Sequence, residues 1–287
     1  ARYVCVRTVK FLPRVHGWPK AIEPLALFAK DQPLKAHTAY VRAKAGDEAA
    51  ALDLLLDLAV AWLYQQRARF APRLWYVAPH AQEATGDNAI PQTLAAMCAA
   101  VWGGTVENAI VQSDRVYHTG ADAMERMATR AQFVGKVQPG ARYVLVDDVT
   151  SLGGTLAELA NYIQCGGGII QDVVVLVNAG RNPALVPLPK NVQLLNRRFG
   201  NEIFNISGIK PEALTANEAQ YLVGFRSIDE IRNRLAAARQ EIYRRLCAKG
   251  ITRAPEGSAT GAHAVQGLNS TDTPVPPPKN PTPPHDA

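Results

Sequence analysis

The stretch Arg142-Tyr-Val-Leu-Val-Asp-Asp-Val-Thr-Ser-Leu-Gly-Gly-Thr-Leu156 decides the predicted fold of this chain. Residues 143–146 are apolar and typical of a short strand buried on both faces. Asp147 and Asp148 follow that strand, and a loop of small residues then leads into a helix that we expect from about residue 156. The stretch therefore predicts the strand, loop and helix of an α/β protein.

The loop and the two acids together are suited to binding a phosphorylated sugar. Backbone amides of the loop and the positive end of the helix attract a phosphate, and the hydroxyls of Ser151 and Thr155 can donate further hydrogen bonds. Asp147 and Asp148 can accept charge-assisted hydrogen bonds from two neighbouring sugar hydroxyls. The alternative is an ordinary strand-turn-helix, in which two adjacent acids at a strand end would have no role.

This stretch resembles the signature with which type I phosphoribosyltransferases bind phosphoribosyl pyrophosphate (PRPP): an apolar run, two acids, a variable pair and a hydroxyl-rich Gly-Gly-Thr loop. The resemblance implies that Asp147 and Asp148 bind the 2′ and 3′ hydroxyls of the ribose. Leu152 departs from the pattern, which often has a hydroxyl residue there, so one donor is lost and the backbone amide remains. The implied 5′-phosphate site is the loop of Thr150, Ser151, Leu152, Gly153, Gly154 and Thr155.

Apolar segments on both sides of this motif alternate with helical ones. The expected elements are strands at 74–78, 106–111 and 169–177, and a helix at 90–101. Strands buried on both faces that alternate with helices indicate an α/β fold with a mostly parallel sheet flanked by helices. Its ligand should lie at the carboxyl ends of the strands, where Asp147 and Pro79 both fall.

Pro79 and His80 begin the loop after the strand at 74–78. The family resemblance implies that this loop faces the pyrophosphate and binds substrate. The loop also loosely resembles an Arg-Gly-Phe-Asn segment of the ComF-type competence proteins, a branch of the same family. Thr85 stands where that branch has arginine, so one phosphate-binding cation is missing. For His80 alone, a surface or capping role is the alternative to a role in catalysis.

Three arginines between residues 112 and 130 are candidates for stabilising a departing pyrophosphate. The resemblance places this segment at the family's mobile active-site loop, which closes over the pyrophosphate with basic residues. Developing negative charge requires cations, so we expect Arg115 and Arg126 to be catalytic, with Arg130 a weaker candidate. Mg²⁺ should act with them, bound mainly through the pyrophosphate and not at a separate protein site. The alternative is that these arginines form surface ion pairs with Asp114, Asp122 and Glu125.

The remainder of the chain divides into regions around this core. A helix is expected over 47–67, with an apolar stripe of Leu52, Leu55, Leu56, Val60 and Leu63, and a capping box at 227–230 should begin a second long helix. Residues 254–287 contain no aromatic residue and many prolines, so they cannot offset their ordering entropy. The predicted regions are an N-terminal helical or irregular extension (1–70), a phosphoribosyltransferase-like α/β core (71–180), a mainly helical C-terminal region (181–253) and a disordered proline-rich tail (254–287).

The composition is that of a globular protein, with 47% hydrophobic and 20% charged residues. There is no run of 18 apolar residues and no signal-peptide pattern at the start, so we expect neither a membrane partner nor export. The 4 cysteines show no C-x-x-C spacing, which argues against a zinc site and favours a cytoplasmic protein. The net charge of +6 is modest, and no basic cluster is interleaved with aromatics, so nucleic-acid binding has no strong signal.

The predicted function is that of a phosphoribosyltransferase, which transfers ribose 5-phosphate from PRPP to a nucleobase-like nitrogenous acceptor. A 6-oxopurine acceptor is disfavoured, because Ser151 stands where transferases for those bases have a proton-exchanging aspartate. The alternative is a non-catalytic protein on the same fold that senses a phosphoribosyl ligand or supports DNA uptake or transfer. A proline-rich scaffold is a weaker third interpretation, and a homodimer is a possible assembly.

Overall fold

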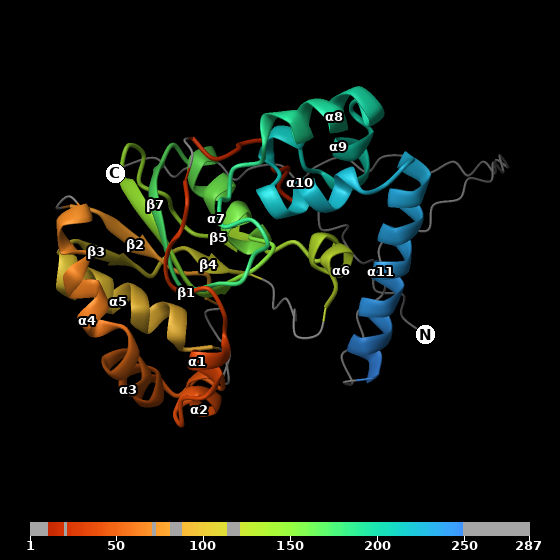
Figure 1. The fold of residues 1–287 in the computed structure, drawn as a ribbon. Coiled ribbons are helices and arrows are strands. Elements are labelled where there is room, and N and C mark those ends of the chain that lie inside the picture. The colour runs from red at the N-terminus through yellow and green to blue at the C-terminus, as the bar shows by residue number, and fades with distance from the viewer. Residues whose placement is uncertain (1–10, 20–21, 71–72, 81–87, 114–120, 249–287) are drawn as a thin grey trace, which may run out of the picture. The chain divides into compact units, whose positions relative to one another are not determined.

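The computed structural model describes residues 11–19, 22–70, 73–80, 88–113 and 121–248. Residues 246–248 are described by their backbone alone. The chain divides into two compact units, Ala1–Pro255 and Glu256–Ala287. The second unit, and with it the predicted disordered tail, lies outside the described residues. Figure 1 shows the labelled helices and strands of the first unit. Within the described ranges, every helix is too short or too polar to cross a membrane.

A five-stranded sheet with the order β1-β7-β6-β2-β3 forms the centre of the first unit. Every neighbouring pair of strands in it is parallel, and β4 and β5 form a separate antiparallel pair. The strands are β1 (Leu25–Phe28), β2 (Trp75–Val77), β3 (Thr105–Glu107), β4 (Val111–Gln112), β5 (Phe133–Val134), β6 (Arg142–Thr150) and β7 (Ile169–Asn178). The mostly parallel α/β sheet with helical flanks predicted from the sequence is confirmed.

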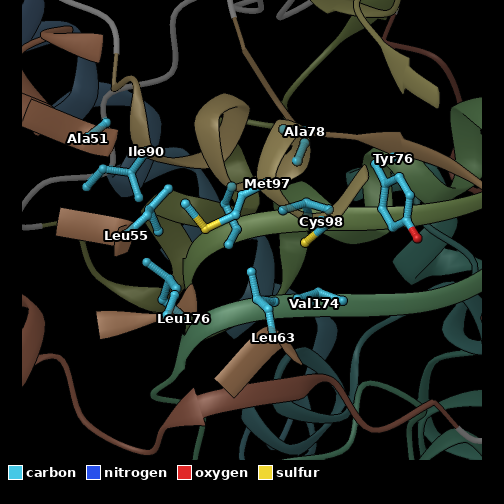
Figure 2. Packing of buried hydrophobic residues seen from close by; sticks show 14 of the residues in the cluster. Ala51, Leu55, Leu63, Tyr76, Ala78, Ile90, Met97, Cys98, Val174 and Leu176 are labelled. Carbon is cyan, nitrogen blue, oxygen red and sulfur yellow. The ribbon is translucent and has the colours of Figure 1, made fainter. Parts of the chain in front are cut away.

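Helices cover both faces of this sheet. Val144 and Val146 on β6 pack into a core cluster with α3 (Glu48–Leu58), α4 (Val60–Gln65) and α5 (Ile90–Trp102), and Figure 2 shows part of that cluster around Leu55, Leu63 and Val174. Tyr143 and Leu145 alternate with them in sequence and pack on the other face, against α7 (Gly154–Cys165). Because successive side chains of a strand point to opposite faces, one apolar run supplies both cores.

A third apolar cluster holds the C-terminal helices together. Its buried residues come from α6 (Ala123–Ala128) and from the helices that follow β7. These are α8 (Pro189–Phe199), α9 (Glu202–Ser207), α10 (Ala216–Val223) and α11 (Ile228–Ala248), with a short 3₁₀ turn at Pro211–Ala213. The predicted capping box is present in part, because the Glu230 amide donates to Ser227 Oγ at 3.2 Å. Figure 1 shows α8, α9 and α10 grouped beside α11.

The strand of the central motif is longer than the sequence indicated. β6 continues through both acids to Thr150 because its backbone remains paired with β7, as far as Thr150 opposite Asn178. Asp147 and Asp148 are therefore part of the strand and not the first residues after it, and their side chains alternate across the sheet.

The predicted long helix over 47–67 is wrong in detail. It is two helices, α3 and α4, separated at Ala59 and followed by a 3₁₀ turn at Arg67–Arg69. Leu55 and Leu63 are fully buried against the sheet as expected, whereas Leu52 and Leu56 are 44% and 47% exposed. Leu52, Leu55 and Leu56 all lie on α3, so the predicted stripe joined residues from its buried and its exposed sides.

Two further predictions about strands require correction. The run at 106–111 is two strands, since β3 ends at Glu107 and β4 begins at Val111 in the separate β4–β5 pair. The region 1–70, predicted to be helical or irregular, contributes β1, which pairs in parallel with β7 at the edge of the sheet. Short helices also occur there, α1 (Gln32–Lys35) and α2 (Tyr40–Lys44).

Candidate active site

A cavity of about 640 Å³ lies where β2, β6 and β7 end. Parallel sheets commonly bind ligands at this edge, because the carboxyl ends of the strands and the following loops meet there. The predicted site residues that line it are Pro79, His80, Arg126, Arg130, Asp147, Asp148, Thr150, Ser151, Leu152, Gly153, Gly154 and Thr155. Arg115 and Thr85 lie outside the described residues.

Asp148 is buried and already has two partners. Its residue is 4% exposed, and its Oδ2 accepts from Lys44 Nζ at 2.8 Å and from Asn88 Nδ2 at 3.0 Å. Burial opposes the charge on Lys44, but attraction to Asp148 and the hydrogen bond between them outweigh it, so the pKa of Lys44 is raised. The Ala89 amide donates to the Ala43 carbonyl at 3.0 Å, which holds the segments of Lys44 and Asn88 side by side.

Asp147 has a different electrostatic environment from its neighbour. Burial raises its pKa well above the ordinary value for aspartate, and the negative charge of Asp148 raises it further. Its Oδ1 accepts the Asp148 amide at 2.8 Å. The two adjacent carboxyls thus have unequal surroundings: Lys44 and Asn88 pair with Asp148, whereas burial and the charge of Asp148 raise the pKa of Asp147.

The loop between β6 and α7 has the geometry of an anion site. Gly153, the residue that precedes α7, has a left-handed φ of 82° and provides no side-chain cap. The first amides of α7 therefore have no side-chain acceptor from that residue and can donate to a ligand. The loop is held from behind by Thr215, whose Oγ1 donates to the Leu152 carbonyl at 2.6 Å.

The arginines of the 112–130 segment separate into two roles. Arg126 is half-buried, lines the cavity and donates from Nη1 to Ser151 Oγ at 2.6 Å. Arg130 is buried and forms a two-pronged bond with Glu158, with Nε to Oε1 and Nη2 to Oε2 both at 2.7 Å. Arg126 is thus available to a ligand at the loop. Arg130 also lines the cavity, but its guanidinium is already paired with Glu158.

A buried network of charges, which no sequence pattern predicted, lies beneath the loop. Arg14 is 1% exposed and donates from Nη2 to Glu218 Oε2 at 2.7 Å, and its Nε lies 3.4 Å from Glu158 Oε1. Glu218 also accepts the Thr215 amide at 2.8 Å in a capping box at the start of α10. The network therefore connects the N-terminal segment to Thr215, the residue that holds the Leu152 carbonyl.

Pro79 and His80 take their predicted place at the cavity, but His80 makes local contacts. Its Nδ1 lies 2.9 Å from the Ala78 carbonyl, and its own carbonyl accepts the Gln112 amide at 2.7 Å. These bonds fix the loop after β2 against β4. They fit the capping interpretation of His80 as well as a contact with ligand.

Sequence reasoning missed Lys44 and Asn88. Lys44 is the last residue of α2, over a hundred positions from Asp148, and nothing near it in sequence forms a motif. Asn88 follows the loop after β2 and could have been suspected from that position alone. Only the folded chain shows that both contact the acid pair.

Sequence comparisons reveal similarity to three curated proteins. Protein TraN of Escherichia coli is 37% identical over 238 residues, which cover 79% of this chain and 50% of TraN. An uncharacterized protein of Haemophilus influenzae is 37% identical over 84 residues, 29% of this chain and 19% of that protein. The hypoxanthine/guanine phosphoribosyltransferase of Methanocella arvoryzae is 34% identical over 64 residues, 22% of this chain and 34% of that enzyme. The chain thus spans half the length of TraN and less of the others, and no protein-family model matches it.

Adenine phosphoribosyltransferases are found among similar solved structures. The enzyme of Thermoanaerobacter pseudethanolicus is 18% identical and aligns over 44% of this chain and 84% of its own, with a TM-score of 0.30. That of Leishmania tarentolae is 13% identical and aligns over 57% of this chain and 99% of its own, with a TM-score of 0.32. With TM-scores this low, the functional conclusion rests on the geometry of the site.

Proposed function

We propose that this chain binds PRPP and transfers its ribose 5-phosphate group to a nitrogenous base. The observation that carries the proposal is that the acid pair, the loop at 151–155 and Arg126 all line one cavity. Its volume of about 640 Å³ lies in the range of small-molecule sites. The 64-residue similarity to an enzyme named hypoxanthine/guanine phosphoribosyltransferase supports the same class of reaction.

The phosphate end of the ligand would bind at the loop. The amides at the start of α7, which have no side-chain cap, and the hydroxyls of Ser151 and Thr155 supply donors. Arg126, already bonded to Ser151 Oγ, adds a positive charge on the same side. These groups would fix the 5′-phosphate and so hold the anomeric carbon of the ribose at one position.

The acid pair would bind the ribose hydroxyls. Asp147 and Asp148 would accept hydrogen bonds from the 2′ and 3′ hydroxyls, with Lys44 already paired to one oxygen of Asp148. In the reaction, the bond from the anomeric carbon to pyrophosphate breaks, and pyrophosphate leaves with the electron pair. A bond to the acceptor nitrogen forms, and that nitrogen loses its proton. Carboxylates beside the ribose stabilise the positive charge that develops on it.

The residues of this edge fit a magnesium ion bound through the substrate. Mg²⁺ is commonly held by one or two carboxylates together with substrate phosphates. Asp147 and Asp148 supply two carboxylates, and within the described parts of the chain no cluster of three or more metal-binding side chains occurs. The ion would neutralise charge on the pyrophosphate, while Arg126 does so at the loop.

Binding can be tested first and turnover second. Calorimetry with PRPP and Mg²⁺ should show binding, which Asp147→Ala should abolish and Asp172→Ala, an acid on β7 outside the cavity, should not. A pyrophosphate-release assay should then be run with adenine, hypoxanthine, guanine and pyrimidine bases. Release with one of them establishes the transferase. If wild-type protein binds no phosphoribosyl compound, the proposal is wrong.

A sensor without catalysis is the second candidate, and the Lys44–Asp148 pair favours it. A cation that already occupies one oxygen of the acid leaves fewer acceptors for the ribose. Thr85, in place of an arginine, also lowers the positive charge available to pyrophosphate. Tight PRPP binding with no pyrophosphate release from any base would select this function. For either function we propose a cytoplasmic setting, which suits the free thiols of Cys98 and Cys165.

A further inference from the structure

A second cavity, of about 710 Å³, adjoins the first on the far side of the phosphate loop. Arg126, Ser151, Leu152 and Ala179 line both cavities, so the two meet at the loop that would hold the 5′-phosphate. The hydrogen bond from Arg126 Nη1 to Ser151 Oγ lies at this junction. A phosphate bound on the loop would therefore have one side toward each cavity.

The second cavity combines positive charge with aromatic surface. Two arginines, Arg126 and Arg181, are among the described residues that line it, and no acidic residue is. Tyr221 and Phe225 form its aromatic wall, with ring centroids 5.3 Å apart and an interplanar angle of 80°. Both rings are half-buried, so each keeps part of its surface open to the cavity. Charge beside aromatic rings is the pattern that recognises a nucleotide, whose base stacks while its phosphate pairs with arginine.

The loop after β7, which carries Arg181, is held in a fixed position. A side chain at Gly180 would meet the Ser151 carbonyl at 2.8 Å and Asn217 Nδ2 at 2.7 Å, so this position requires glycine. Asn217, on α10, accepts the Asn182 amide at 2.9 Å and donates to the Asn182 carbonyl at 3.0 Å. The loop after β7 is therefore fixed between the phosphate loop and α10, and Arg181 is held at the cavity.

We propose that the second cavity binds a nucleoside joined through phosphate to the ribose 5-phosphate held in the first cavity. The preferred ligand would then be a dinucleotide-like molecule, whose 5′-phosphate carries a second ester or anhydride bond, and not a free 5′-phosphate alone. This inference rests on the proposed function, because it takes the loop at 151–155 as the site of the 5′-phosphate. It deepens that function by naming the class of compound that the site selects.

The test compares three probes by calorimetry: ribose 5-phosphate, AMP, and ADP-ribose, in which the two are joined through their phosphates. ADP-ribose should bind at least about 10-fold more tightly than ribose 5-phosphate, as expected for one stacked base. Arg181→Ala and Phe225→Leu should each remove most of this gain and leave the affinity for ribose 5-phosphate unchanged. Arg197→Ala, which removes an exposed arginine of α8, is the matched control and should change neither affinity.

Each other outcome has a definite meaning. Equal affinities for ADP-ribose and ribose 5-phosphate would overturn the inference and leave the proposed function intact. So would AMP binding that matches ADP-ribose, because the second phosphate-linked group would then add nothing to the affinity. If Phe225→Leu lowers the melting temperature, Arg181→Ala decides, because Arg181 is exposed. Binding of none of the phosphoribosyl probes would remove the proposed function together with the inference.

Discussion

Lys44 Nζ lies 2.8 Å from Asp148 Oδ2, although more than a hundred residues separate them in the chain. Because of this contact, we expect the two adjacent acids of β6 to have opposite effects on the stability of the folded protein. Asp148 has a cation beside it, whereas burial and the charge of Asp148 make ionisation of Asp147 unfavourable. The difference can be measured with isosteric amides.

We expect Asp147→Asn to stabilise the protein at neutral pH and Asp148→Asn to destabilise it. The pKa of Asp147 is raised on folding, so its favourable contribution is complete below its unfolded value of about 3.8 and is lost as pH rises through the folded value. The melting-temperature gain of Asp147→Asn should therefore be near zero below pH 3.8 and grow with rising pH. Thermal unfolding from pH 3.5 to 8 measures it, and an Asp147→Asn variant less stable than wild type at pH 7.5 would contradict this account.

The phosphate loop should tolerate alanine at Gly154 better than at Gly153. Alanine at 153 must adopt φ of 82° and place its Cβ 3.0 Å from Leu185 Cδ2, which should cost about 1–3 kcal/mol of unfolding free energy. At 154, the first residue of α7, the only close neighbour is Glu218 Oε1 at 3.0 Å. Urea denaturation of both variants gives the comparison, and equal losses would show that the loop backbone is not constrained at Gly153.

Thr215→Val should weaken phosphate binding although Thr215 is not among the residues that line the cavity. It removes the bond to the Leu152 carbonyl and the hydroxyl that accepts the Glu218 amide at 3.1 Å, with an expected loss of about 1–2 kcal/mol in stability. Thr93→Val, which removes a hydroxyl bond to the Ala89 carbonyl at 2.8 Å on α5, is the control. Calorimetry with ribose 5-phosphate should show weaker binding for the first variant alone, and unchanged binding there would separate Thr215 from the loop.

Arg126→Gln and Arg130→Gln should separate ligand binding from stability. Arg130→Gln breaks a buried pair with Glu158 and should lower the free energy of unfolding by about 3–5 kcal/mol. Arg126→Gln should leave the melting temperature nearly unchanged and weaken binding of a phosphate ligand roughly 10-fold or more, the range for a bond to a charged group. Unfolding curves and calorimetry on both variants test this, and a large loss of stability in Arg126→Gln would assign it to the framework instead.

The central unit of the fold could be predicted because its signals are local. The apolar run before Asp147, the glycines after it and the helix that follows indicate a strand, a loop and a helix within residues 142–165. The loop residues then reach the cavity because the strand order brings that edge together. The predicted division at residue 70 has no counterpart in the sheet. β1 belongs to the sheet because it pairs with β7, and no local sequence pattern encodes that pairing.

The electrostatic details could not be predicted because they depend on contacts distant in sequence. Arg14 and Lys44 lie in the N-terminal region and contact Glu218 on α10 and Asp148 on β6, and each is indistinguishable in sequence from a surface charge. The difference between Arg126 and Arg130 likewise follows from which of them meets Glu158 on α7. Spacing placed both arginines in the right segment but could not assign their roles.

The parallel pairing of β1 with β7 also determines the order in which the chain can fold during synthesis. Leu25 pairs with Val174, so β1 leaves the ribosome about 150 residues before its partner. At translation rates of 5–20 residues per second, this is a delay of roughly 8 to 30 s. Throughout that interval the apolar strand has an unpaired edge, the kind of surface that associates with other chains. Synthesis of β7, the last strand of the sheet, thus sets the earliest moment at which β1 can pair.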